Sequence, residues 1–308
     1  MLLKVNLRGN KIHKNISAIL TYFCVSCLVF LILYPILIKI FSSLRSMEDL
    51  YDSTVQLIPK HMSMEILILT GTVMKYIPSF INSVLLSLLV AVLQVASSAS
   101  IGYGLAKFKF KGRGLVYALV IITLLIPKQT ITTALFLNFR YHDILGVFEL
   151  ITGNPLNLIG TIWPFVLLSI TGFGLKNGLY IYLTMQTFKG LPKEFDEAAS
   201  VDGAGVLKTF FCIMLPNAKT ILVTVFLFSF CWQWTDSYYS GLFVKDMNLL
   251  SRTIYYVVNY GNNGSVDQVL VSALQNAAIL LLLLPLLILY LFCQKSFIQG
   301  VAKSGITG

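Results

Sequence analysis

The chain has 308 residues, of which 56% are hydrophobic and only 12% are charged, and its mean hydropathy is +0.80. A composition this apolar excludes an ordinary soluble globular domain and indicates a protein that lies in a lipid bilayer. The net charge of +10 does not indicate a nucleic-acid partner, because the lysines and arginines form short clusters between apolar stretches rather than one basic face or tail.

Six apolar stretches are long enough to cross the hydrocarbon core as helices, which takes roughly 20 residues each. A basic leader precedes the first stretch, which is longer than the core of a signal peptide, so we expect an uncleaved anchor. Because the runs are continuous rather than alternating, they predict helices and not a barrel. The predicted fold class is an all-α polytopic membrane protein with six transmembrane helices, at about 17–41, 79–105, 115–137, 159–187, 217–242 and 271–294.

The distribution of lysine and arginine predicts the orientation of these helices. With the amino terminus inside, the larger share of the basic residues outside the spans lies on the cytoplasmic side, as in other multi-spanning proteins. Both termini are therefore predicted to be cytoplasmic. The predicted domains are a leader at 1–16, a transmembrane domain at 17–294 that includes a cytoplasmic loop at 190–216, and a cytoplasmic tail at 295–308.

The cysteines and histidines indicate neither a disulfide framework nor a metal site. Cys24 and Cys27 form a C-x-x-C, but it falls inside a predicted span, and the three histidines are widely separated. We expect no metal ion and no cofactor bound in this chain.

The cytoplasmic loop at 190–216 has the pattern of two short helices joined by a turn. Asp202-Gly203 is a suitable stop for the first helix, and Pro216 is predicted to end the second. Phe195, Ala198 and Ala199 share one apolar face of the first helix, which would allow another backbone to approach closely. The alternative is an interfacial helix that has no protein partner.

This loop resembles the EAA loop of ABC importer permeases, which reads E-A-A-x-x-D-G-A and ends in hydrophobic-x-L-P. The resemblance implies a coupling helix that docks into a cleft on a separate cytoplasmic ATPase, with the acidic residue pairing a basic group there. The residues that the resemblance assigns to this coupling are Glu197, Ala198, Ala199, Asp202, Gly203, Ala204, Leu215 and Pro216.

The rest of the chain is similar to the carbohydrate, maltose-type branch of these permeases, and the similar segments cover most of residues 17–308. The similar segments are Asn82-Ser83, the run at 102–106, the run at 111–114, Ile126-Pro127, the run at 232–239, the Leu-Pro-Leu at 284–286 and the tail from Gln294 to Gly300. The run at 232–239 lacks the proline that usually follows in that branch, and the last residues of the chain also differ from the common ending.

The resemblance implies the type I ABC importer permease fold and a permease subunit of an ATP-driven, binding-protein-dependent sugar importer in the bacterial cytoplasmic membrane. It implies four kinds of partner: a second homologous permease, two cytoplasmic ATPases that bind ATP and magnesium, an extracytoplasmic sugar-binding protein and the sugar itself. The chain has no G-x-x-x-x-G-K-[ST] loop, so we expect no ATP hydrolysis and no enzyme activity in this subunit.

Three alternatives stay open at this point. The same type of importer could carry glycerol phosphate, a polyamine or another small solute. A secondary transporter working alone would have broken helices in repeated halves and carboxylates within the membrane. A membrane-embedded enzyme would need a cluster of catalytic residues, and no His, Cys or carboxylate cluster has such spacing.

Polar and aromatic residues within the predicted spans are candidates for the substrate pathway, because a polar group in lipid must face a cavity or another polar group. Aromatic rings could also stack on sugar rings. The alternatives are a pairing of Lys128 with Asp236, helix-to-helix contacts, side chains that reach the interface, and an interfacial aromatic belt. The candidates are Lys128, Gln129, Trp232, Gln233, Trp234, Asp236, Tyr238 and Asn276.

Overall fold

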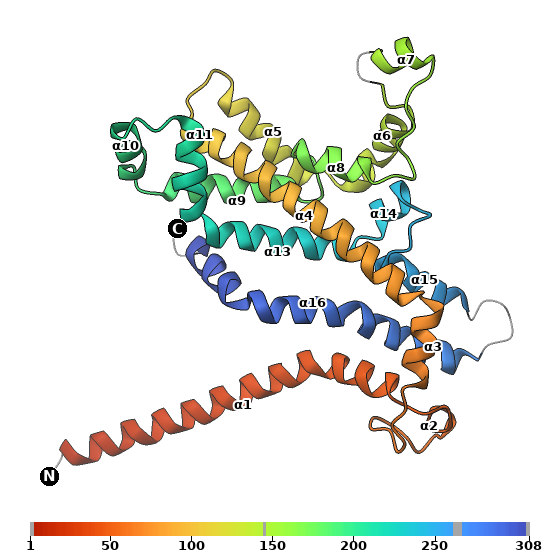
Figure 1. Ribbon diagram of the computed structural model, residues 1–308. Coiled ribbons are helices and arrows are strands. Elements are labelled where there is room, and N and C mark those ends of the chain that lie inside the picture. The colour runs from red at the N-terminus through yellow and green to blue at the C-terminus, as the bar shows by residue number, and fades with distance from the viewer. Residues whose placement is uncertain (1–2, 144–145, 261–266, 306–308) are drawn as a thin grey trace. The chain divides into compact units, whose positions relative to one another are not determined.

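The computed structural model describes residues 3–143, 146–260 and 267–305, and nearly all of its regular structure is helical (Figure 1). Besides the helices, the described residues form two isolated antiparallel bridges. The prediction of an all-α polytopic membrane protein is confirmed. The helices are α1 (Leu3–Ser43), α2 (Met47–Tyr51), α3 (Glu65–Val73), α4 (Tyr76–Lys107), α5 (Arg113–Leu125), α6 (Lys128–Arg140), α7 (Val147–Thr152), α8 (Trp163–Ile170), α9 (Asn177–Gly190), α10 (Glu194–Val201), α11 (Val206–Thr209), the π-helix η1 (Phe210–Met214), α12 (Leu215–Asn217), α13 (Lys219–Thr235), α14 (Tyr238–Phe243), α15 (Leu250–Tyr260) and α16 (Gln268–Gly305).

The helices form two compact units. Unit 1 comprises Met1–Val73 and Tyr256–Leu281, and unit 2 comprises Met74–Tyr255 and Leu282–Gly308. Unit 1 therefore holds the first predicted span and the beginning of the last. Unit 2 holds the four middle spans and the predicted cytoplasmic loop.

Three helices among the described residues are by themselves long and apolar enough to cross a membrane. They are Asn15–Ser43 of α1, Tyr76–Lys107, which is α4, and Gln268–Gln294 of α16. These segments agree with the first, second and sixth predicted spans.

The third predicted span is broken into α5 and α6, whose axes differ by 106°. The break follows from Pro127, which has no backbone N–H to donate and restricts the residue before it to extended conformations. Ile126 is extended, with φ −72° and ψ 119°. The expectation of one continuous helix at 115–137 is therefore corrected to two short helices with a sharp corner between them.

The fourth and fifth predicted spans are broken too. Between α8 and α9 the chain turns through Gly172 and Lys176, which both have positive φ, 82° and 62°. The fifth predicted span, at 217–242, is interrupted at Asp236, whose extended backbone ends α13 before α14 begins. At the start of the same span, at Ala218, the helical segment that begins with α11 bends by 79° into α13. Counting each strongly bent pair as one span gives up to five spans in the described chain.

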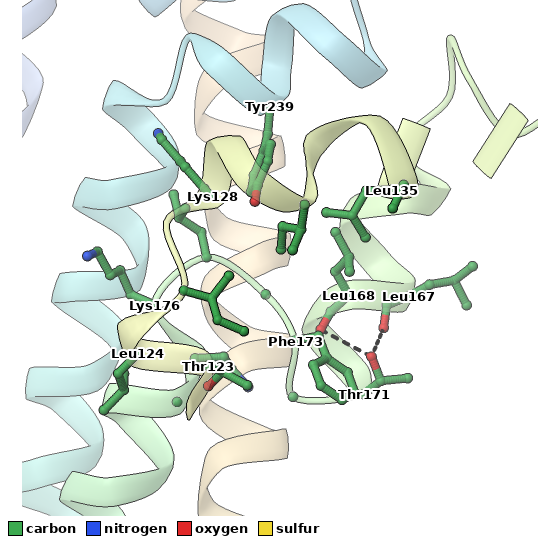
Figure 2. Close-up of a pocket in the computed structure, with 18 of the residues that line it drawn as sticks. Thr123, Leu124, Lys128, Leu135, Leu167, Leu168, Thr171, Phe173, Lys176 and Tyr239 are labelled. Carbon is green, nitrogen blue, oxygen red and sulfur yellow. Dashed lines mark hydrogen bonds between the residues drawn. The ribbon is translucent and has the colours of Figure 1, made fainter. Parts of the chain in front are cut away.

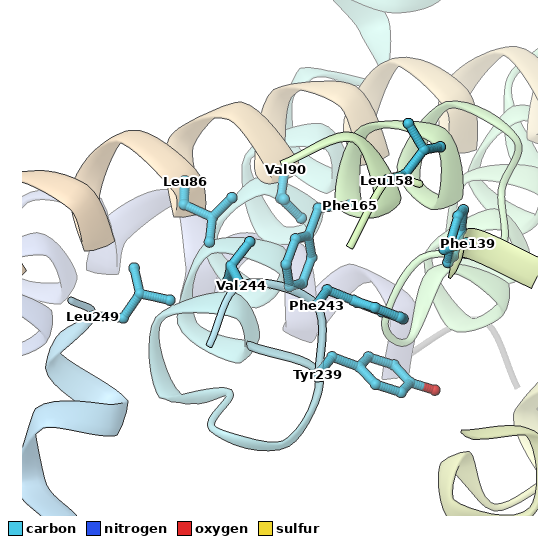
Figure 3. Packing of buried hydrophobic residues seen from close by; sticks show 9 residues of the cluster. All are labelled: Leu86, Val90, Phe139, Leu158, Phe165, Tyr239, Phe243, Val244 and Leu249. Carbon is cyan, nitrogen blue, oxygen red and sulfur yellow. The ribbon is translucent and has the colours of Figure 1, made fainter. Parts of the chain in front are cut away.

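The core of unit 2 forms where α4 packs against α9 and α13. One end of this core contains the aromatic residues Tyr103, Phe188 and Phe210, whose ring centroids lie 4.9 to 6.3 Å apart. A second cluster joins α4, α6, α8 and α14, and Figure 3 shows Phe243 between Phe139 and Phe165 at its centre. Burial of large aromatic side chains makes these helices a fixed frame for the segments between them.

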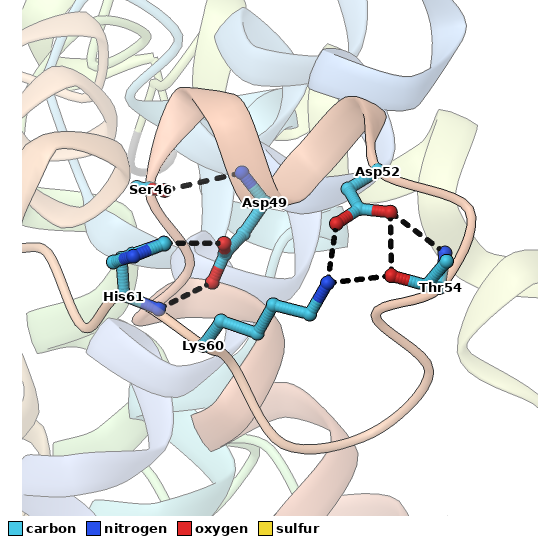
Figure 4. Close-up of polar contacts among 6 residues, drawn as sticks. All are labelled: Ser46, Asp49, Asp52, Thr54, Lys60 and His61. Carbon is cyan, nitrogen blue, oxygen red and sulfur yellow. Dashed lines mark hydrogen bonds and ion pairs between the residues drawn. The ribbon is translucent and has the colours of Figure 1, made fainter.

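In unit 1 the segment between α1 and α3 folds on itself through a set of polar contacts (Figure 4). The Asp49 carboxylate accepts from the backbone N–H of His61 at 2.7 Å and lies 3.1 Å from its ring Nδ1. Asp52 accepts from Lys60 at 2.7 Å and from the Thr54 hydroxyl, also at 2.7 Å. These two carboxylates hold residues 52–61 as a closed loop.

We predict that Asp49→Asn opens this loop. The hydrogen bond from the His61 N–H holds the pKa of Asp49 below its usual range, so the contact stabilises the fold at all pH values above about 4 and is lost as the pH falls through the lowered pKa. Amide hydrogen exchange at pH 7 should speed up at least tenfold across residues 52–61 in the variant. Glu48→Gln is the control, because Glu48 is the exposed neighbour in α2, and equal exchange in both variants would contradict the role of Asp49.

Candidate functional site: a loop with an exposed apolar surface and a cavity among broken helices

One face of the helix α10 packs against the rest of unit 2. Ala199 is only 2% exposed, and Phe195 packs against the aromatic cluster around Tyr103 and Phe188. On the adjoining side, Lys107 at the end of α4 donates to Asp196 at 2.6 Å. The small-residue face was predicted to let another backbone approach closely. Ala199 is buried against other parts of this chain, whereas the neighbouring Ala198 is exposed.

The predicted turn after α10 is present. Gly203 has φ +66°, a conformation that side chains with a Cβ rarely adopt, and the Ala204 N–H donates to the Ala199 carbonyl at 2.9 Å. The chain then continues at Val206 into the second predicted helix. The loop 190–216 thus consists of two helical segments joined by a turn, as predicted.

The second helical segment ends within one residue of the predicted end at Pro216. It passes through α11, the π-helix η1 and α12, and ends at Asn217, where the chain bends into α13. The π-helix lies immediately before the proline, and a widened turn of this kind accommodates the missing backbone donor. Within this segment Phe210 and Met214 are buried, while Phe211 is exposed.

The loop presents an exposed surface that combines apolar and acidic side chains. Val201 is 87% exposed and Leu207 is 72% exposed, and Phe211 and Glu197 are exposed as well. We call Glu197, Ala198, Val201, Leu207 and Phe211 the coupling surface. Exposed large apolar side chains are typical of surfaces that contact another protein or lipid. Of the other residues assigned by resemblance, Asp202, Gly203 and Pro216 are exposed, while Ala204 and Leu215 are half-buried.

A cavity of about 1070 Å³ opens in unit 2 where the two breaks of the middle spans meet (Figure 2). It is lined by the corner at 123–129 between α5 and α6, by the break at 171–178 between α8 and α9, and by residues of α6, α8, α13 and α14. Its size is at the upper end of the range for small-molecule sites, and its lining is mostly apolar with a few polar groups.

Three of the predicted pathway residues, Lys128, Gln129 and Trp232, line this cavity. Lys128 lies 3.8 Å from the buried carboxylate of Asp236 and 5.1 Å from the ring centroid of Tyr238. Asp236 also accepts from the backbone N–H of Ser240 at 2.8 Å and so caps α14. The structure therefore brings Lys128, Asp236 and Tyr238 together, as an ion pair with an aromatic neighbour.

The other three candidates lie elsewhere. Gln233 lines a much smaller cavity, and its Nε2 has no hydrogen-bond partner in the described residues. Trp234 is 1% exposed, and its indole N–H donates to the Leu282 carbonyl at 3.1 Å. Asn276 belongs to unit 1, where it accepts from Lys39 at 3.3 Å and donates to Ser42 at 3.2 Å. The contacts of Trp234 and Asn276 hold helices together, which was the alternative reading for such residues.

Sequence reasoning did not select Lys176, which also lines the cavity. Its ammonium lies 5.1 Å from the ring centroid of Trp232. The available signal was a lysine inside an apolar stretch, shortly after two glycines, Gly172 and Gly174. Such a residue is a default candidate for function because an intramembrane charge is costly.

Buried hydrogen bonds of polar side chains connect the helices α4, α9 and α13 beside the cavity. Gln94 of α4 accepts from Ser229 of α13 at 2.5 Å, and Asn177 at the start of α9 donates to Ser97 at 3.2 Å. Farther along, Thr184 donates to the Ser98 carbonyl at 2.8 Å. Buried polar groups that are paired across three helices define one relative position of those helices.

The fold and these sites define a class of protein, the multi-pass α-helical membrane permeases with a cavity among broken helices and an anchored, exposed loop. The sequence profile of the binding-protein-dependent transport system inner membrane components matches residues 98–303, and the chain belongs to this family. It is accordingly a transport component of the cytoplasmic membrane.

Individual relatives agree with this assignment. The chain is 27% identical to the arabinooligosaccharides transport system permease protein AraQ of Bacillus subtilis, over 90% of this chain and 92% of the relative. It is 24% identical to the galactooligosaccharides transport system permease protein GanQ of the same organism, over 97% and 98%. Its fold is similar to a chain in the crystal structure of a bacterial ABC transporter involved in the import of the acidic polysaccharide alginate, with a TM-score of 0.69, 21% identity and coverage of 92% and 97%.

Proposed function

We propose that this chain is one of two permease subunits of an ATP-driven, binding-protein-dependent importer of saccharides. The observation that carries the proposal is the coupling surface: exposed apolar side chains beside Glu197, on a loop that Asp196, Phe195 and Ala199 attach firmly to the helices. One face of this loop is fixed to the helices of this chain, and the other face is free to bind a partner. A loop of this kind can pass a rigid-body motion from the partner to the transmembrane helices.

In this proposal the partner at the coupling surface is a cytoplasmic ATPase, which binds ATP and magnesium, while this subunit catalyses no reaction. Both termini and the loop 190–216 lie on the cytoplasmic side. A second, homologous permease supplies the other half of the pathway, and a binding protein delivers the cargo from outside. Saccharide cargo is supported by relatives named as oligosaccharide transport permeases, which align with nearly the whole chain.

The cavity is the proposed part of the pathway in this subunit. Lys128, Gln129 and Trp232 line it, and Asp236 and Tyr238 hold Lys128 in place. A flat ring beside polar groups suits a sugar, which has an apolar C–H face and a rim of hydroxyl groups.

Affinity purification of this subunit from its native membrane, with mass spectrometry of the chains that accompany it, tests the proposal. An ATPase of the ABC type and a second permease should be recovered in amounts comparable to the tagged subunit. Recovery of the subunit alone or only with copies of itself, from a preparation that still transports solute, would contradict the proposal.

A further inference from the structure

The cavity in unit 2 is positively charged. Two lysines, Lys128 and Lys176, are among its lining residues, and the lining contains no Asp or Glu within the described part of the chain. Figure 2 shows the two lysine side chains on the same side of the cavity. An ammonium group that lines a cavity can form charge-assisted hydrogen bonds with the carboxylate or phosphate of a ligand.

The two lysines differ in how far their charges are balanced. Lys128 has the carboxylate of Asp236 at 3.8 Å. Lys176 has the Trp232 ring at 5.1 Å, and no carboxylate of the described residues lies within ion-pair distance of its ammonium. Of the two lysines, Lys176 is therefore the one whose positive charge is not already balanced by a carboxylate and can bind an anionic ligand.

Lys176 has an unusual backbone conformation at the start of α9. Its φ of 62° is left-handed, a region that is costly for residues other than glycine and asparagine. The neighbouring break already contains Gly172 and Gly174, so the chain places a strained lysine where glycine would be easier to accommodate. Lys75 has a similar φ of 48° but does not line the cavity, so what supports a ligand site at Lys176 is its place in the cavity lining and not its backbone conformation.

Two helix termini that line the cavity also favour an anionic ligand. The amino-terminal ends of α6 and α9 both line the cavity, through residues 127–129 and 176–178, and neither end has a side-chain cap. The amino end of a helix carries partial positive charge, and broken helices in transporters direct such ends at anionic groups of their substrates.

We propose that the cargo of this importer is a saccharide that carries an anionic group, either a uronate carboxylate or a phosphate ester, and that Lys176 selects it. This inference rests on the proposed function and adds the chemical class of the substrate. Lys176 binds the anionic group, Trp232 lies against the sugar ring, and Lys128 remains paired with Asp236.

The test uses the purified complex with its binding protein, reconstituted in vesicles and supplied with ATP. The probes are two pairs matched in size: digalacturonate against galactobiose, and lactose 6-phosphate against lactose. The variants are Lys176→Gln, which removes the charge, and Lys176→Arg, which keeps it. Lys75→Gln is the matched control, because Lys75 is an exposed lysine that also has left-handed φ, 48°, and also precedes a long helix, but does not line the cavity.

We expect the wild-type complex to take up one acidic probe in preference to its neutral partner, and the pair concerned identifies the group as carboxylate or phosphate. Lys176→Gln should lower this uptake at least tenfold at low substrate concentration and change uptake of the neutral partner less than twofold. Lys176→Arg and Lys75→Gln should keep most of the acidic uptake.

Two results would overturn the inference and leave the proposed function in place: ATP-dependent uptake of the neutral sugars alone by the wild-type complex, or an equal effect of Lys176→Gln on acidic and neutral probes. Absence of ATP-dependent uptake for all four saccharides would instead remove the proposed function and this inference with it.

Discussion

Replacing Val201 with glutamate is expected to release the ATPase from the complex while the permease stays folded. Val201 is 87% exposed at the end of α10, so the change touches little within this chain. In the docked complex the new carboxylate would lose its water without gaining a partner, which costs several kcal/mol. Recovery of the ATPase with the tagged subunit should fall at least tenfold, measured by quantitative mass spectrometry of the purified complex.

Leu150→Glu is the matched control for this prediction. Leu150 is also 87% exposed, but it lies in α7, in a loop that the sequence places on the opposite side of the membrane. This variant should keep its ATPase. Full recovery of the ATPase with Val201→Glu, or equal loss with both variants, would show that the coupling surface does not hold that partner.

The second large effect is expected from Gly102→Ala, which should destabilise the packing of α4 against α9. A Cβ at this position would lie 2.3 Å from the Thr184 hydroxyl and 2.9 Å from the Met185 backbone nitrogen, so the helices would have to separate. Overpacking of this kind costs about 1–3 kcal/mol. The apparent melting temperature of the detergent-solubilised subunit, followed by size-exclusion chromatography after heating, should fall by several degrees.

The control for Gly102→Ala lies two residues further along the same helix. The nearest atom to a Cβ at Gly104 is 4.0 Å away, which is ordinary contact. Gly104→Ala should leave the melting temperature unchanged or raise it slightly, because alanine favours helix more than glycine does. A melting temperature for Gly102→Ala equal to that of Gly104→Ala would contradict the close packing of α4 on α9.

Much of this architecture could be predicted from the sequence because long apolar runs and helix stop signals act locally. The apolar spans within α1, α4 and α16, and the turn at Gly203, follow from the length of the runs and from residues that favour a stop, whereas the extension of α1 back to Leu3 and of α16 on to Gly305 was not predicted. The break at Ile126-Pro127 was available as a local signal as well. Its angle of 106° was not, since a proline sets only where a helix is interrupted, and packing decides how far the chain turns.

The candidate site could be predicted only in part, because charged residues in apolar runs look alike until the fold pairs them. Lys128 and Asp236 were both candidates, and the structure makes them a pair at 3.8 Å. Asn276 had the same signal but contacts Lys39 within unit 1. Lys176 became prominent only through the break between α8 and α9, which brings it to the cavity beside Trp232.

The central claim is that transport by this subunit is powered by an ATPase on another chain. Uptake of labelled saccharide into membrane vesicles, with and without ATP and with and without an imposed proton gradient, tests it most directly. The account predicts uptake that requires ATP and persists when the proton gradient is dissipated. Uptake by the subunit alone that follows the proton gradient and needs no ATP would contradict the account and identify a secondary transporter.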